Sequence, residues 1–148
     1  MFELIKGLHN LLRWIVVFGG VYALWTSLRG LISGGVWAPT DRRAGLIFTS
    51  SLNVQLVLGI VVYLFSPLVR GAFGNMGAAM QDDHLRFFAV EHLVIMLLAV
   101  VSAQLGYSLA RRAPTDRAKF VRSSIGYLIA ALLLVYGIPW GRSLIPWA

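Results

Sequence analysis

The sequence predicts an all-α membrane protein: an up-down bundle of four transmembrane helices with both termini outside. Of its 148 residues, 58% are hydrophobic and only 13% are charged, and the mean hydropathy is +0.75. In an average soluble domain about a quarter of the residues are charged. The apolar residues also gather in four long blocks, each able to supply a membrane span of about 20 residues. The whole chain, residues 1–148, is therefore expected to form one domain.

The four blocks place the spans at about residues 8–32, 46–68, 87–110 and 123–140. In the first span, Gly19 and Gly20 allow a close approach of another helix. Pro67 is typical of a helix end and fits the end of the second span. Thr115 is a candidate N-cap ahead of the fourth helix, and Trp147 in the tail is a candidate interface anchor.

The basic residues predict the orientation. The chain carries 13 Lys and Arg against 6 Asp and Glu. Eight basic residues flank the first and third loops: Arg29, Arg42, Arg43, Arg111, Arg112, Arg117, Lys119 and Arg122. Only four flank the opposite side: Lys6, Arg70, Arg86 and Arg142. Cytoplasmic loops carry an excess of Lys and Arg, so we expect the termini and the middle loop outside. The positive charge then faces anionic lipid, and nucleic acid is not an expected partner.

The absence of cysteine limits the kinds of metal site and cross-link that the chain can form. It excludes disulfides, thiolate zinc sites, Cys-ligated iron–sulfur clusters and covalently attached c-type haem. The sequence also has no Gly-rich phosphate loop, no nucleophile elbow and no HExxH motif. An electron carrier or an accessory subunit is therefore expected rather than a stand-alone enzyme.

Two histidines lie at similar depth in the predicted bundle. His9 is in the first turns of the first span, and His92 is about 8 Å into the third at about 1.5 Å per residue. Spans one and three can lie diagonally across the bundle, with axes about 14 Å apart. That gap is too wide for direct contact but suits two imidazoles with a flat metallomacrocycle between them. The spacing alone therefore raises axial ligation of haem iron by His9 and His92 as a hypothesis, beside ordinary hydrogen-bonded histidines.

Two further charged residues lie at comparable depth. Arg13 follows His9 by four residues and shares its helix face, whereas Glu91 is about 100° around the helix from His92. An ion pair between Arg13 and Glu91 would lower the cost of burying both charges. Alternatively, Glu91 orients a histidine or relays a proton near a quinone, and Arg13 meets an anionic group such as a haem propionate.

A weaker candidate metal site lies in the middle loop. Met76, Met80 and His84 are spaced by four and would share one face if the loop were helical. Thioether and imidazole groups suit copper(I). The alternative is an amphipathic turn whose methionines dip into lipid.

Four stretches in order, HNLLRW, NVQLVLGIVVYLFSP, LRFFAVEHLVIML and IGYLIAALLLVYGIPW, resemble small four-span bacterial membrane proteins labelled cytochrome b or cytochrome b561-like. The resemblance covers nearly the whole chain, and RFFAVEH is its most specific part. It implies a haem b-binding bundle in the bacterial inner membrane, with His9 and His92 as the matching histidines. The chain departs from that group at Asn53, near which the group has a histidine.

Three functions remain open from the sequence. The first is a b-type cytochrome-like protein that binds haem b and transfers electrons, with quinol or as a subunit of a larger respiratory or photosynthetic complex. The second is a non-enzymatic accessory subunit of a membrane complex without its own haem. The third is copper handling by Met76, Met80 and His84.

Overall fold

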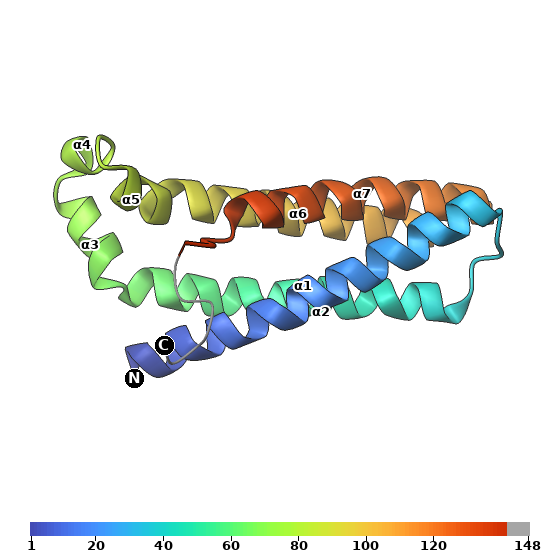
Figure 1. The fold of residues 1–148 in the computed structure, drawn as a ribbon, viewed down its shortest axis with the longest axis horizontal. Helices are drawn as coiled ribbons and strands as arrows, with labels where there is room; N and C mark the ends of the chain where they lie inside the picture. Colours follow the sequence, from blue (N-terminus) through green and yellow to red (C-terminus); the bar gives the residue numbers. More distant parts are fainter. Residues whose placement is uncertain (142–148) are drawn as a thin grey trace.

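The computed structural model describes residues 1–141, and within them the chain is helical. The four long helices are α1 (Phe2–Ser33), α2 (Pro39–Phe65), α6 (His92–Arg111) and α7 (Asp116–Gly137) (Figure 1). Three short helices, α3 (Pro67–Gly74), α4 (Met76–Ala79) and α5 (Asp83–Arg86), connect α2 to α6; we call these three the platform. A π-helical turn, η1 (Phe87–Glu91), joins the platform to α6. Trp147 and Arg142 lie outside the described residues.

Four helical stretches are long and apolar enough to cross a membrane: Phe2–Ser33, Pro39–Phe65, Asp83–Arg111 and Asp116–Gly137. This confirms the four expected spans, although the helices around the second and fourth begin about seven residues earlier than predicted. Their first turns are polar and capped. Ala38 N–H donates to Asp41 Oδ2 at 2.8 Å, and Ala118 N–H donates to Thr115 Oγ1 at 3.2 Å. The Thr115 cap was therefore predicted correctly, while the apolar pattern missed the polar turns that follow the caps.

Pro67 ends the second long helix, as expected, but it also begins α3. Helix α2 stops at Phe65, and Ser66 takes an extended conformation. Proline disfavours a helical conformation in the residue before it and is well suited to the first helical position. The chain therefore turns at Ser66, and the predicted end of the span at residue 68 was too late.

The long helices form a ring in which each contacts two neighbours. Helix α1 packs on α2 and α7, and α6 packs on α2 and α7. Helices α1 and α6 are therefore diagonal, as the sequence allowed, and so are α2 and α7. Consecutive long helices run in opposite directions, and the start of α1 and the end of α7 lie at the same end as the platform (Figure 1).

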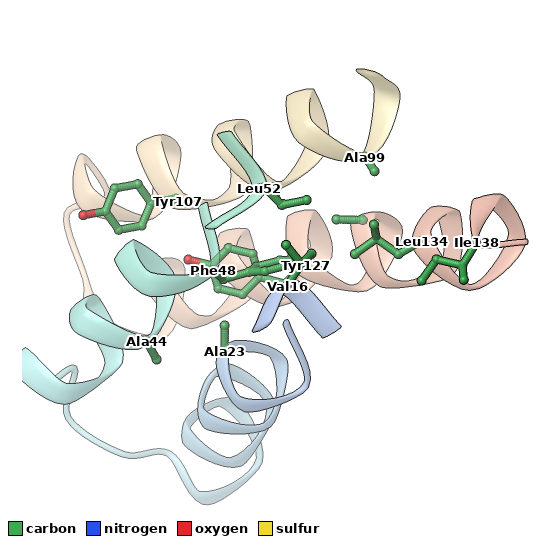
Figure 2. Packing of buried hydrophobic residues seen from close by; sticks show 12 residues of the cluster. Val16, Ala23, Ala44, Phe48, Leu52, Ala99, Tyr107, Tyr127, Leu134 and Ile138 are labelled. Carbon is green, nitrogen blue, oxygen red and sulfur yellow. The ribbon is translucent and has the colours of Figure 1, made fainter. Parts of the chain in front are cut away.

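The bundle is packed most closely between α6 and α7, in the half away from the platform. A Cβ atom at position 106 would lie 2.8 Å from the Cα atom of Gly126, so the two backbones touch. Ser102 Oγ donates to the Gly126 carbonyl at 2.9 Å. Across the diagonal between α2 and α7, Phe48 and Tyr127 meet edge to face with ring centroids 5.6 Å apart (Figure 2). Small residues and interhelical hydrogen bonds are the usual means of packing helices in lipid.

The outer surface of the long helices is apolar. Exposed large side chains occur on each of them, for example Phe18, Trp25, Val57, Val101 and Leu132. A surface of this kind suits contact with the hydrocarbon of a bilayer, where the hydrophobic effect does not penalise it.

We expect Gly126→Ala to destabilise the bundle by about 1–3 kcal/mol, because the added methyl group overpacks the α6–α7 contact. The measurement is unfolding of the protein in detergent micelles, followed by circular dichroism. Gly71→Ala is the matched control, since a Cβ at Gly71 meets nothing within 4 Å. A Gly126→Ala protein as stable as Gly71→Ala would contradict the close contact.

Candidate functional site

A cavity of about 740 Å³ opens between the long helices in the half of the bundle nearest the platform. Its walls come from all four long helices, from α3 and from η1. Both His9 and His92 line it. The volume is within the range of small-molecule sites, roughly 300–1,000 Å³. The structure thus brings the two predicted histidines to one cavity from diagonal helices.

His9 is held by α2. Gln55 Nε2 donates to the backbone carbonyl of His9 at 2.8 Å and lies 3.4 Å from His9 Nε2. Gly59, one turn further along α2, leaves room for the ring, because a Cβ there would lie 3.1 Å from His9 Cε1. Among the described residues, His9 Nδ1 and Gln55 Oε1 are buried polar atoms with no hydrogen-bond partner. Each such atom costs about 1–3 kcal/mol when it is left unsatisfied.

His92 is held by the end of α7. Its Nδ1 lies 2.8 Å from the carbonyl oxygen of Gly137. A carbonyl only accepts, so Nδ1 carries the proton and, in the neutral ring, Nε2 keeps its lone pair. Gly137 allows this approach, since a Cβ there would lie 2.7 Å from Ile95 Cγ2. This is the arrangement in which metal-binding histidines are usually held.

The cavity wall carries positive charge. Arg13 is buried, lines the cavity, and lies close enough to interact electrostatically with both imidazoles. Lys6 and Glu3 also line the cavity, and they form an exposed salt bridge at 2.7 Å. Arg13 therefore supplies the buried positive charge of the site.

Glu91 does not form the ion pair with Arg13 that was one of its two predicted roles. Its carboxylate binds Arg86 Nε at 2.7 Å, in place of the predicted pair with Arg13. The cause is the π-helical turn. Its backbone hydrogen bonds join residues five apart, so Arg86 and Glu91, which are five residues apart, lie on the same side of the helix. Glu91 is outside the cavity lining, whereas the adjacent His92 is part of it.

Asn53 joins two helices and takes no part in the cavity. Gln104 Nε2 of α6 donates to Asn53 Oδ1 at 2.9 Å, and Asn53 is exposed on the outside of α2. This residue, at which the chain departs from the group that it resembles, thus acts as a polar contact between helices.

Met76, Met80 and His84 do not lie on one helix. Helix α4 ends at Ala79, the chain turns, and α5 begins at Asp83. Met76 packs against an apolar cluster, Met80 is exposed, and His84 meets Phe88 edge to face with ring centroids 5.2 Å apart. The shared helix face on which the copper hypothesis depended is therefore not formed. Among the described residues, no three His, Cys, Asp or Glu side chains come together as a metal site.

Three residues that shape the site were not predicted from the sequence: Gly59, Tyr63 and Gly137. Gln55, Gly59 and Tyr63 are spaced by four, so they share one face of α2. A row of polar and small residues in a span otherwise rich in branched aliphatic residues was the available signal. Gly137 had no comparable signal, because its role depends on how α7 ends against α6.

Comparison with known proteins gives no relative: no family model, no curated protein and no solved structure matches the chain.

Proposed function

We propose that this chain is an integral membrane protein that binds haem b between His9 and His92 and carries single electrons. The observation that carries the proposal is that imidazoles from diagonal helices line one cavity. A flat macrocycle could be bound from both sides between such helices. Histidine is a common protein ligand of haem iron, either alone or with a second protein ligand.

The residues present would fit haem in two ways. The Gly137 contact leaves His92 Nε2 available to bind iron. Haem brings nitrogen ligands of its own, so it would need fewer protein ligands than a three-residue metal site, which the described part of the chain lacks.

When bound, haem supplies reversible one-electron chemistry, and the protein supplies ligands, charge and exclusion of water. The Gly137 carbonyl makes His92 a more basic ligand. Arg13, a buried cation of the cavity wall, would bind a negatively charged carboxylate group of haem. The lipid-facing surface supports a lipid-soluble quinol or a larger respiratory or photosynthetic membrane complex as the electron partner.

The basic residues support a finer placement in the membrane. Eight of the 13 Lys and Arg lie in or beside the loops between α1 and α2 and between α6 and α7, mostly in the helix ends that flank them. By the positive-inside rule, both termini and the platform then face the outer side of the bacterial inner membrane.

We expect purified wild-type protein, expressed with adequate haem, to give a b-type reduced-minus-oxidised spectrum, and His9→Ala and His92→Ala each to lose it. Removal of either axial ligand leaves the iron with one protein bond. His84→Ala is the matched control, because the third histidine is exposed on the platform and outside the cavity lining.

A wild-type protein without a b-type signal would refute haem binding. Stable co-purification with a larger complex, still without pigment, would then identify an accessory subunit. A signal that survives in His9→Ala and His92→Ala would place the haem elsewhere.

We expect Gly77→Cys on the platform to react with a membrane-impermeant maleimide added to intact cells, and Gly35→Cys in the first loop to react only after permeabilisation. The chain has no cysteine of its own, so each variant carries a single reactive thiol. The reverse pattern would invert the proposed orientation.

A further inference from the structure

The π-helical turn η1 is placed directly before His92. It spans Phe87–Glu91, and the backbone N–H of His92 donates to the Phe87 carbonyl five residues earlier. Well under 1% of residues in soluble proteins adopt π-helices. Such turns occur mostly as single interruptions of an α-helix, and they are frequent at functional sites. A turn of this kind persists only where neighbouring groups hold it.

Helix α2 holds the turn from the cavity side. Tyr63 lines the cavity, and its hydroxyl donates to the Ala89 carbonyl at 2.6 Å. A π-helical turn disturbs the regular α-helical bonding of its carbonyls, and this bond gives one of them a partner from another helix.

Arg86 holds the same turn from the platform side. Its Nε binds Glu91 Oε1 at 2.7 Å, at the far end of the turn. Its Nη2 binds Asp83 Oδ1 at 2.7 Å, and its Nη1 donates to the Met80 carbonyl at 3.0 Å. The Arg86 guanidinium thus connects Met80 and Asp83 to Glu91, the last residue before His92.

The turn determines what surrounds the His92 ring. Phe87 and Phe88 both contact it, with ring centroids 5.7 Å and 6.1 Å away. In a regular α-helix the residue four positions back shares a face with His92, whereas the residue five back is about 140° around the helix at 100° per residue. The π-helical turn brings both phenylalanines beside the imidazole, whose Nδ1 is fixed by Gly137.

We propose that Tyr63 and Arg86 are positioning residues, which hold the π-helical turn so that the His92 imidazole is oriented into the cavity to bind haem iron. This inference rests on the proposed function. Groups that orient a metal-binding side chain commonly change metal affinity or activity by 10- to 100-fold when they are replaced.

The test uses full-length Tyr63→Phe, which removes one hydroxyl, with Tyr22→Phe as the matched control because Tyr22 is an exposed tyrosine of α1. In the haem-loaded protein we expect about 10-fold faster haem dissociation for Tyr63→Phe. We also expect shifted g values in its low-spin ferric electron paramagnetic resonance spectrum, because these report the orientation of the axial imidazoles. In the haem-free protein we expect the ¹⁵N resonances of the His92 ring to shift, while those of His84 stay in place.

Glu91→Gln is the second variant, because it weakens the Arg86 contact without removing a cavity residue. We expect it to change the same three signals in the same direction. Wild-type dissociation, g values and His92 resonances in both variants would overturn the inference. Equal shifts at His84 and His92 would overturn it too, because they would indicate general loosening of the fold.

The experiments distinguish a failure of haem binding from a failure of the positioning role of Tyr63. If the wild-type protein binds no haem, the proposed function fails, but the His92 resonances of the haem-free protein still decide the role of Tyr63. A shift there supports positioning of the imidazole, and no shift overturns it.

Discussion

The close backbone contact between α6 and α7 at Gly106 and Gly126 is the constraint on which the rest of the bundle depends. Lipid gives apolar side chains no reason to leave it, so helices associate there through close packing and interhelical hydrogen bonds. The two glycines supply the close packing, and Ser102 supplies one of the interhelical hydrogen bonds. Helix α1 lies against α7 at the end away from the platform, and it diverges from α7 toward the platform end (Figure 1). The divergence leaves the cavity in which the two histidines face a common space.

The two diagonals of the bundle are filled in different ways. Between α2 and α7, Phe48 and Tyr127 span the diagonal and close the core (Figure 2). Between α1 and α6, the polar side chains of His9 and His92 reach the cavity from opposite walls. Hydrogen bonds made by Gln55 and by the Gly137 carbonyl hold these two residues from the neighbouring helices. The second diagonal thus encloses a cavity where the first is filled by packed side chains.

The sequence predicts the fold well because the cost of exposing polar backbone in lipid leaves few architectures for four apolar blocks. It also predicts that His9 and His92 lie across the bundle from each other, and the structure brings both to one cavity from diagonal helices. It does not predict the partner of Glu91, because a π-helical turn changes which residues are neighbours and has no composition of its own. The polar first turns of α2 and α7 were missed for a similar reason: capping, rather than apolar periodicity, begins those helices.

The two halves of the bundle differ because the cavity lies in only one of them. Its walls use the first turns of α1 and α6 and the last turns of α2 and α7, so it lies near the platform face. The opposite half is filled by side chains such as Phe48, Ala103 and Tyr127. This half is about 15 Å of low-dielectric material if the hydrocarbon core is about 30 Å thick. A charge placed in the cavity would therefore be insulated from the far face of the bundle.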